Sequence, residues 1–311
     1  MSLPLSIVIP TLDDRELLAT CLAALLPELE RRALGDEVVV VDDSGAADGQ
    51  HGSASADSLA AHLAASDAGV SGSGFTLRCL ANSRNLGFAR SLHAGVAAAR
   101  HGLVLALNPD VCVRPGALEP LVETLTRHAD VALVAPYVLQ GGEDGGEESV
   151  PALVFEDGFH RIVRSPLDVT PGEVSSAYPD GVPAGFALGG ACLMRRDEFL
   201  AAPYDPRFEP FYWEDVDLAE RARAAGRRVL VDPRSVVEHW NRGTIGERVP
   251  ESLVRAAIEK NRLLFTWKHE RDPERLREHL ETLAGRVLEH ATCEQREELI
   301  WLLLALEQSP S

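Results

Sequence analysis

The first third of the chain alternates between short apolar runs and segments with helical spacing. Runs rich in β-branched and aliphatic residues, typical of strands buried on both faces, lie at residues 5–10, 37–43 and 103–111, and a further strand is expected at 75–80. Residues 14–32 and 82–102 have helical spacing, with Asp13 or Asp14 as a cap for the first helix, and a short helix is expected near 57–65. This alternation predicts an α/β fold with a doubly wound, mostly parallel sheet.

The rest of the chain is less regular and ends in helices. The expected elements are a strand running into a short helix at 185–196, a helix at 215–226, short strands at 227–233 and 235–240, and helices at 272–290 and 293–308. Gly226 suits the end of one helix, and Asp272 followed by Pro273 suits the start of another. The sequence therefore predicts one α/β domain with a helical extension.

Charge and cysteine content argue against a nucleic-acid-binding protein and against a disulfide-bonded one. The 311 residues carry a formal net charge of -18, which argues against nucleic acid as a partner because phosphate backbones bind basic surfaces. The five cysteines are odd in number and show no CxxC spacing, which is typical of reduced thiols in a cytoplasmic protein. The amino terminus reads as a first strand rather than a signal peptide, and no transmembrane segment is expected.

Acidic residues follow three of the predicted strands. They are Asp13 and Asp14, Asp42 and Asp43, and Asp110. Ligands of doubly wound sheets bind at the carboxyl ends of the strands. No GxGxxG follows the first strand and no GxxxxGK[ST] occurs, so a dinucleotide dehydrogenase or a P-loop enzyme is not expected. Acids without a glycine-rich loop instead suggest a diphosphate neutralised by a bound cation.

The order of seven motifs resembles bacterial family 2 glycosyltransferases with the GT-A fold. They are IPTLDD, VVVVDDSG, NSRNLGFARSLHAG, LALNPDV, LGGACLMRR, FYWEDVDLAERARAAGRRVL and VEHWNRGT. The resemblance spans residues 6–244, with a weaker match at 261–269. It implies transfer of a sugar, rhamnose or another deoxysugar in some relatives, from a nucleotide-diphosphate donor to a polysaccharide or lipid-linked acceptor.

The resemblance implies a nucleotide site on the exit loops of the first strands. Asp42 would contact the base, since a carboxylate can accept the N3–H of uracil or thymine, although an Asx turn is the alternative for such an Asp. Asp43, Pro10, Thr11 and Asp13 would flank the same nucleotide, and Asp13 stands where relatives often carry Asn.

A second group of residues is expected around the diphosphate. Asn85 and Gly87 would approach it with backbone amides. His93 replaces the usual Asn further along that helix. Asn108 begins the NPD sequence that occupies the family's DxD position, where only Asp110 keeps a carboxylate.

Asp110 is the candidate metal ligand, and the resemblance adds His239. Hard oxygen ligands suit Mg²⁺ or Mn²⁺, and an imidazole ligand favours Mn²⁺. A plain NPD turn and a packed histidine are the alternatives for these two residues. With one acid instead of two, the donor diphosphate must supply further ligands.

FYWEDVDL, residues 211–218, holds the candidate catalytic acids. The family's general base is the second residue of the Glu-Asp pair, which is Asp215, and Glu214 would bind or position the acceptor. Apolar neighbours raise the proton affinity of a carboxylate, which helps it to take a hydroxyl proton. Asp217 is expected to stabilise the first turn of the helix. Acceptor contacts are assigned to Gly189, Gly190, Trp213 and Trp240.

These assignments predict a metal-dependent inverting hexosyl- or deoxyhexosyltransferase that uses a UDP- or dTDP-sugar in cell-surface polysaccharide or glycolipid synthesis. Residues 1–112 would form the nucleotide-binding half and 113–248 the acceptor-binding half of the domain, followed by the helical extension 249–311. A sugar nucleotidyltransferase is the alternative, but its Gly-rich basic loop is missing from TLDDRELL. A non-catalytic nucleotide-sugar-binding subunit is a further alternative, which the intact acidic pair disfavours.

The carboxyl-terminal helices raise the question of what covers them. Their polar residues are too acidic for a helix that grips an anionic membrane surface. The run Leu299–Glu307 is nevertheless apolar, so we expect it to pair with the helix that begins after Asp272. This predicts a cytoplasmic protein, with peripheral membrane contact as the alternative, and a homodimer rather than a monomer.

Overall fold

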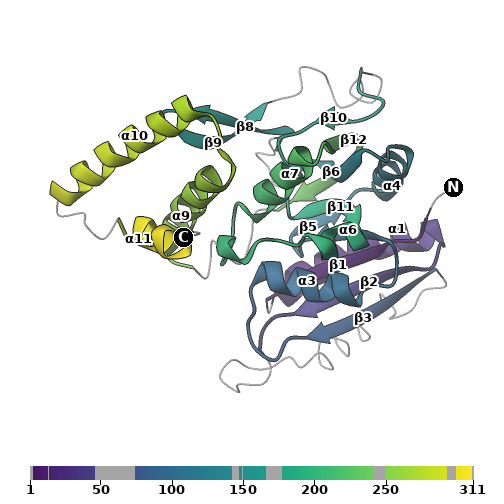
Figure 1. The fold of residues 1–311 in the computed structure, drawn as a ribbon. Coiled ribbons are helices and arrows are strands. Elements are labelled where there is room, and N and C mark those ends of the chain that lie inside the picture. The colour runs from purple at the N-terminus through teal and green to yellow at the C-terminus, as the bar shows by residue number, and fades with distance from the viewer. Residues whose placement is uncertain are drawn as a thin grey trace.

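One ten-stranded sheet organises the protein (Figure 1). The computed structural model describes residues 3–12, 14–45, 74–141, 147–148, 150–165, 177–240, 249–292 and 299–309. Along the sheet the strand order is β10-β12-β6-β11-β4-β1-β2-β3. These strands are β1 (Ser6–Thr11), β2 (Asp36–Asp42), β3 (Phe75–Ala81), β4 (Leu103–Leu107), β6 (Val131–Gln140), β10 (Val182–Pro183), β11 (Ala191–Arg195) and β12 (Arg228–His239).

Six of these strands run in one direction. β3, β2, β1 and β4 pair in parallel, as do β6 and β12. β11 lies antiparallel between β4 and β6, so the two parallel groups share the same direction. The carboxyl ends of β1, β2, β3, β4, β6 and β12 therefore meet at one edge, together with the start of β11. The predicted doubly wound, mostly parallel sheet is confirmed.

Alternation along the central strands sends side chains into two cores. Ile7 and Ile9 of β1 face the core beneath helices α1 (Arg15–Arg32) and α4 (Leu118–Arg127). Val8 faces the opposite core, which includes Leu92 of α3 (Phe88–Ala98). Because both faces are covered, the strands are continuous apolar runs, as the sequence predicted.

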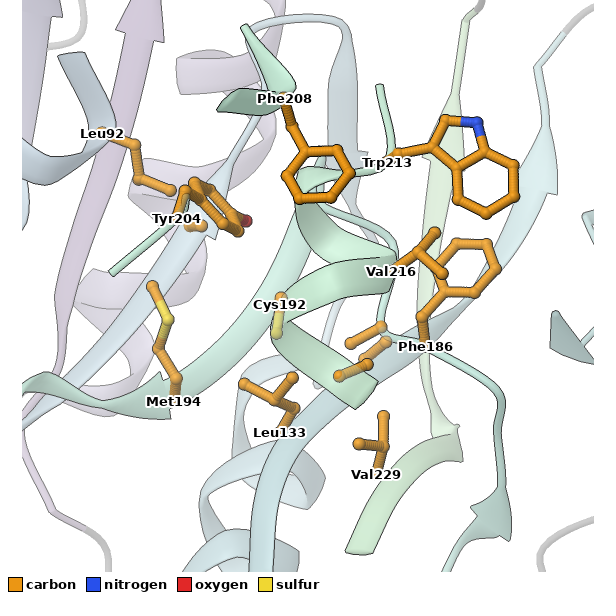
Figure 2. Packing of buried hydrophobic residues seen from close by; sticks show 14 of the residues in the cluster. Leu92, Leu133, Phe186, Cys192, Met194, Tyr204, Phe208, Trp213, Val216 and Val229 are labelled. Atoms are coloured by element: carbon orange, nitrogen blue, oxygen red, sulfur yellow. The ribbon is translucent and has the colours of Figure 1, made fainter. Parts of the chain in front are cut away.

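The second core continues around the helix α7 (Glu214–Ala224). Figure 2 shows Trp213 and Val216 close to Phe186, with Leu133 and Val229 below them. The short helices α6 (Arg196–Ala201) and η1 (Pro206–Phe208) precede this region. Phe208 of η1 is buried in the same core, so packing fixes the chain on its way into α7.

A second group of elements lies beside the sheet (Figure 1). It contains a separate hairpin of β8 (Val150–Glu156) and β9 (Phe159–Ser165), followed by the helices α9 (Glu251–His269), α10 (Pro273–Thr292) and α11 (Ile300–Gln308). Two small strands complete the main sheet, β5 (Val111–Val113) against β12 and β7 (Glu147–Glu148) against β6. Residues of α9, α10 and α11 belong to the same core as α7, which couples the helical extension to the sheet domain.

Several local predictions need correction. Asp14 is the amino-cap residue of α1, but its side chain makes no capping hydrogen bond. The two strands expected at 227–233 and 235–240 are one strand, β12, whose register against β6 shifts between Asp232 and Val236. This bulge absorbs the interruption at Pro233 without ending the strand. The short helix expected near 57–65 and the cap Asp13 lie outside the described residues.

The expected pairing of the last two helices is also wrong. α11 packs mainly on α9, and Trp301 and Ala305 are its buried residues. α10 instead turns its buried residues His279 and Leu283 toward the β8–β9 hairpin, where the imidazole Nδ1 lies 2.8 Å from the carbonyl oxygen of Gly158. The amino-terminal cap of α10 is confirmed, because Asp272 Oδ1 accepts a hydrogen bond of 2.9 Å from the amide of Glu274.

Candidate active site

The carboxyl edge of the sheet brings the predicted residues of distant segments together. The amide of Asp43 donates to the carbonyl oxygen of Thr11 at 2.9 Å, which joins the exits of β1 and β2. The amide of Asn108, after β4, donates to the carbonyl oxygen of Gly190 at 2.8 Å. Pro10 pairs with Val41 in the β1–β2 ladder. Antiparallel pairing of β11 with β4 therefore delivers Gly189 and Gly190 to the exit of β4.

The two acids after β2 have different surroundings. Asp42 is buried, and its Oδ1 accepts a hydrogen bond of 2.9 Å from the amide of Ser44, which is the Asx-turn geometry. The carboxylate of Asp43 accepts bonds from the side chain of Asn82 (2.8 Å) and from the amides of Leu86 (2.7 Å) and Gly87 (2.8 Å). Asp43 thus orders the loop before α3.

The amide of Gly87 has hydrogen-bond partners within the protein. Its amide, predicted to approach a diphosphate, donates to Asp43 and also lies 3.1 Å from Oδ1 of Asn85. Gly87 has φ of 82°, a conformation that glycine adopts without strain, and it begins α3. His93 packs with its ring centroid 6.4 Å from that of Phe199 on α6. The loop is therefore braced from within the protein.

Four buried oxygen atoms at this edge have no hydrogen-bond partner among the described residues. They are Thr11 Oγ1, Ser44 Oγ, Asp110 Oδ1 and Glu214 Oε2. A buried polar group without a partner destabilises a protein by about 1–3 kcal/mol. Such atoms gathered at a ligand-binding edge are suited to a polar ligand that satisfies them.

Asp110 and His239 meet although 129 positions separate them. β5 follows Asp110 directly and pairs antiparallel with the end of β12, which sets His239 opposite Val111. Nε2 of His239 lies 3.2 Å from Oδ2 of Asp110. The amide of Trp240 donates to the carbonyl oxygen of Asp110 at 3.0 Å, which fixes the strand end. The structure therefore places the two predicted metal ligands side by side.

Asp110 and His239 are suitable ligands for a cation that is also coordinated by further ligands. The buried Oδ1 of Asp110 has no partner among the described residues, and a carboxylate with an imidazole is a donor set for Mn²⁺. No group of three or more His, Cys, Asp or Glu side chains within the described ranges could hold a metal ion. A cation bound here would therefore need ligands beyond these two side chains.

Glu214 and Asp215 open α7 at the same edge. The amide of Gly189 donates to Oδ2 of Asp215 at 3.1 Å, and the amide of Val216 donates to Oδ1 at 2.8 Å. Burial raises the pKa of Asp215 to about 6, against the opposing effect of these two bonds. Burial and the neighbouring Asp215 charge raise the pKa of Glu214 to about 8. Burial therefore favours the protonated form of both carboxyl groups, and the charge of Asp215 adds to this effect at Glu214.

The two glycines before β11 differ in how much space surrounds them. A Cβ on Gly189 would lie 3.5 Å from Cβ of Asp215, which is an ordinary contact, so the space there does not require glycine. A Cβ on Gly190 would lie 2.9 Å from Nδ2 of Asn108, which is closer than real contacts allow. Gly190 therefore permits the close approach of the NPD turn to β11.

The aromatic residues assigned to the acceptor lie in different places. Trp213 is buried, with its ring centroid 5.1 Å from that of Phe265 on α9. Trp240 is exposed and covers Gly141, where a Cβ would lie 2.7 Å from the indole. The structure therefore separates the two tryptophans: one packs before α7, and the other lies next to the Asp110–His239 pair.

The chain enters α7 through two residues in an unfavourable conformation. Tyr212 and Trp213 have φ of 71° and 73°, where side chains other than glycine are strained. Nδ2 of Asn261, a fully buried residue of α9, lies 2.7 Å, 2.9 Å and 2.8 Å from the carbonyl oxygens of Phe208, Phe211 and Tyr212. One amide side chain thus holds the strained turn.

Lys260 supports the same turn. Its Nζ lies 2.9 Å from the carbonyl oxygen of Arg207, 2.5 Å from that of Glu209 and 3.2 Å from Oε1 of Gln308 at the end of α11. The sequence analysis did not predict that Lys260 and Asn261 contact this turn. The weaker family match over 261–269 begins at Asn261 and could have indicated that residue, whereas Lys260 lies outside the match.

Asp217 has a larger role than the predicted first-turn effect. Its buried carboxylate contacts Lys268 (2.6 Å), His269 (2.7 Å) and Arg221 (2.9 Å). Burial alone would raise the pKa of Asp217, but the bonds from His269 and Lys268, with the charges of Lys268 and Arg221, lower it. The ion pairs join the start of α7 to the end of α9.

Solved structures share this architecture. One is GalNAc-T7 with UDP, GalNAc and Mn2+ (TM-score 0.61, 17% identity, 85% of this chain and 47% of that chain). The mannosyltransferase PcManGT from Pyrobaculum calidifontis, in complex with GDP-Man and Mn2+, gives 0.53 at 13% identity over 100% of this chain and 77% of that chain. TarS 1-349 of S. aureus gives 0.55 at 15% identity over 98% and 79%. The fold is thus that of the GT-A transferases.

Sequence comparison shows a similarity to one family over the first half of the chain. Residues 6–151 match the family described as "Glycosyl transferase family 2". Over 170 residues the chain is 28% identical to the N-acetylglucosaminyl-diphospho-decaprenol L-rhamnosyltransferases of two Mycobacterium tuberculosis strains, covering 52% of this chain and 54% of each relative. The chain therefore spans about half the length of these curated relatives. Residues 6–151 are thus similar to glycosyltransferase family 2.

No helix among the described residues is long and apolar enough to cross a membrane.

Proposed function

We propose that this protein transfers a hexose or deoxyhexose from a nucleotide-diphosphate donor to a hydroxyl group of a saccharide or lipid-linked acceptor. The observation that carries the proposal is the arrangement at the sheet edge. A carboxylate with raised pKa, Asp215, shares this edge with the Asp110–His239 pair and the exits of β1 and β2. The similarity to a rhamnosyltransferase supports a deoxysugar donor.

The donor would lie along the exits of β1, β2 and β4. Asp42 remains the candidate for the uracil or thymine base, because only its Oδ1 is used in the Asx turn. Thr11 and Ser44 offer buried hydroxyl groups to the nucleotide. Asp43, Asn85 and Gly87 act through the loop that they brace rather than by direct contact.

Asp110 and His239 would hold a divalent cation, Mn²⁺ or Mg²⁺, together with the donor diphosphate. When bound, the cation neutralises charge on the leaving nucleoside diphosphate. Because the diphosphate would supply the remaining ligands, two protein side chains would be enough to hold the cation. Asn108 shapes the turn that presents Asp110, through its bond to Gly190.

Asp215 is the proposed general base of a single inverting displacement. Its carboxylate takes the proton of the acceptor hydroxyl as that oxygen attacks the anomeric carbon, and the bond to the diphosphate oxygen breaks. Two backbone amides orient the carboxylate. Glu214, whose raised pKa favours the protonated form, is suited to donate a hydrogen bond to the acceptor.

Nucleotide binding tests the proposal directly. UDP or dTDP with Mn²⁺ should raise the Tm of the full-length protein, because a ligand that binds only the folded state stabilises it. Asp110→Ala and His239→Ala should each weaken Mn²⁺-dependent binding in calorimetry. If the affinity for the nucleoside diphosphate is independent of the metal and unchanged in both variants, the NPD sequence is a plain turn without a metal-binding role.

A further inference from the structure

A second cavity lies away from the sheet edge, between β9, α9 and α10. Its volume is about 550 Å³, and Phe159, Arg262, Thr282 and Arg286 are among its lining residues. Trp213 also lines it, two positions before Asp215. The cavity therefore borders the turn that carries the proposed general base without containing the strand exits assigned to the nucleotide.

The cavity is lined by more positive than negative side chains. Arg161, Arg262 and Arg286 line it, with Asp157 and Glu259 as the acids. His160 lines it too, and burial lowers the pKa of its imidazole, which favours the neutral form. This excess of positive charge stands in a protein whose formal net charge is -18.

Two of the arginines share one carboxylate oxygen. Oε2 of Glu259 accepts a bond from Nη2 of Arg262 and lies 3.1 Å and 3.2 Å from Nη1 and Nη2 of Arg286. Arg161 pairs with Asp157 at 2.9 Å. The two positive charges of Arg262 and Arg286 are therefore compensated by only one carboxylate, that of Glu259. In addition, Nε of Arg262 is buried without a partner among the described residues.

An aromatic side chain holds both guanidinium groups in place. The Arg262 and Arg286 carbon atoms Cζ lie 4.3 Å and 5.1 Å from the ring centroid of Phe159. Burial, the largest influence, and the charges of Arg286 and Arg161 lower the pKa of Arg262 despite Glu259. Stacked guanidinium groups with spare N–H donors are suited to bind phosphate oxygens.

The neighbouring cavity has no such excess of charge. It lies between β8, α7 and α9, has a volume of about 670 Å³, and is lined by two arginines and two glutamates. Arg223 pairs with Glu220 at 2.5 Å, and Arg275 lies 3.6 Å from Glu270. Arg275 also stacks on an aromatic residue, with Cζ 5.4 Å from the ring centroid of Phe155. Arg275 therefore provides a matched control for the substitution of Arg286.

We propose that the cavity between β9, α9 and α10 binds a phosphate or diphosphate group of the glycosyl acceptor through Arg262 and Arg286. The inference rests on the proposed glycosyl transfer and adds an anionic acceptor to it. Trp213 links this anchoring site to the turn of Asp215, so a sugar attached to the phosphate would extend toward the base. Arg286 also stacks on Trp301 of α11 at 5.0 Å, beside the exposed Ile300 and Leu303. An isoprenoid chain attached to the phosphate would lie against this apolar surface.

Calorimetry with inorganic pyrophosphate and with farnesyl diphosphate tests the site. We use full-length protein carrying Asp110→Ala, so that the strand-exit site contributes little to the signal. Both ligands should bind, and Arg286→Gln should weaken binding at least tenfold. Arg275→Gln, on the same helix in the balanced cavity, should change the affinity less than twofold. Tighter binding of farnesyl diphosphate than of pyrophosphate identifies an isoprenoid-linked acceptor, and equal binding identifies a phosphate without a lipid.

Glu259→Gln gives a test in the opposite direction. Removing this carboxylate frees the guanidinium groups, so pyrophosphate should bind several-fold more tightly even if the Tm falls. The proposal is overturned if neither ligand binds, if Arg286→Gln and Arg275→Gln behave alike, or if Glu259→Gln fails to increase affinity. Failure of nucleoside diphosphates to bind protein with Asp110 intact would instead overturn the proposed function.

Discussion

Two neighbouring carboxyl groups at the start of α7 differ in their hydrogen bonds. Both oxygens of Asp215 accept bonds from backbone amides, whereas Oε2 of Glu214 has no partner among the described residues. Consecutive positions on a helix point about 100° apart, so the two side chains cannot serve one reacting atom equally. The anchored group is suited to be the base and the other to be a hydrogen-bond donor.

Substitution of each acid should separate these roles. Asp215→Asn removes the proton acceptor and should lower kcat by about 10²-fold or more, with nucleotide affinity nearly unchanged. Glu214→Gln keeps a neutral donor of the same length and should lower kcat by less than about 10-fold. Single-turnover transfer and calorimetry measure the two effects. Retained turnover in Asp215→Asn would assign the base to Glu214.

The pKa values of the pair predict a pH dependence of the rate. Protonation of Asp215 should lower kcat/KM as the pH falls below about 6. Ionisation of Glu214 should lower it as the pH rises above about 8. Glu214→Gln should therefore abolish the alkaline limb and keep the acidic one. The range from about pH 5 to about pH 9 extends about one unit beyond each of the two pKa values. A wild-type kcat/KM that is constant over this range would contradict the assignment.

Glu214 should also affect stability. Its pKa is raised in the folded protein to about 8 from an ordinary value of 4.5, so the folded state binds the proton more tightly than the unfolded state. The free energy of unfolding should therefore fall as the pH rises from 4.5 to about 8. Glu214→Gln should remove this loss and be more stable than wild type at high pH. Urea unfolding of both proteins at either end of this range measures the difference.

At the scale of elements, α9 determines the conformation of the turn before α7. Asn261 contacts three carbonyl groups of this turn, and Tyr212 and Trp213 have positive φ. The strained backbone persists because α9 is docked against it. Asn261 is therefore a positioning residue for Asp215.

Asn261→Ala should disturb catalysis more than another buried substitution on the same helix. Loss of its amide leaves buried carbonyl groups unpaired, which should lower the free energy of unfolding by about 3 kcal/mol. We expect a fall in kcat with little change in the KM of the donor. Thr266→Val is the control, because Thr266 is equally buried but bonds to Arg262 and His160, away from the turn. Equal kcat in both variants would make Asn261 purely structural.

For the whole molecule, the last helix contributes to the fold but leaves apolar surface outside. Trp301 and Ala305 of α11 are buried against the core that contains Leu263 and Leu264 of α9, whereas Leu303 is 65% exposed and Leu306 is 53% exposed. The homodimer expected from the sequence stays a prediction. The net charge of -18 disfavours attachment to an anionic membrane.

Substitution of the exposed surface tests the dimer without removing the helix. Leu303→Glu should convert a dimer to a monomer in light scattering, because a charge in an apolar interface is unfavourable. Leu288→Glu on α10, 68% exposed in wild type, is the matched control and should leave the mass unchanged. A monomeric wild-type protein excludes the dimer. If the wild-type protein sediments with anionic vesicles and the Leu303→Glu variant does not, this surface binds a membrane.

Local sequence determined most of the sheet and helices. The valines of Val38–Val41 alternate between two cores, so they had to be apolar throughout, and this makes the strand recognisable without its neighbours. Acids that end parallel strands meet at one edge of the sheet, which is why the common location of Asp42 and Asp110 was predictable. The Asp272–Pro273 start of α10 was equally predictable because a cap depends on adjacent residues only.

Only the tertiary structure decided which distant groups meet and how their charges behave. The pairing of β5 with β12 brings His239 to Asp110, and the docking of α9 brings Asn261 to the turn before α7. The pairing of α11 with α9 rather than α10 is a packing choice between similar apolar helices, which their periodicity does not distinguish. Composition likewise indicated a uniformly acidic protein, whereas burial raised the pKa of Glu214 and Asp215 and folding gathered Arg262 and Arg286 in one cavity. Proton affinity and local potential depend on solvent exclusion and on charges brought close by folding, and neither is a property of neighbouring residues in sequence.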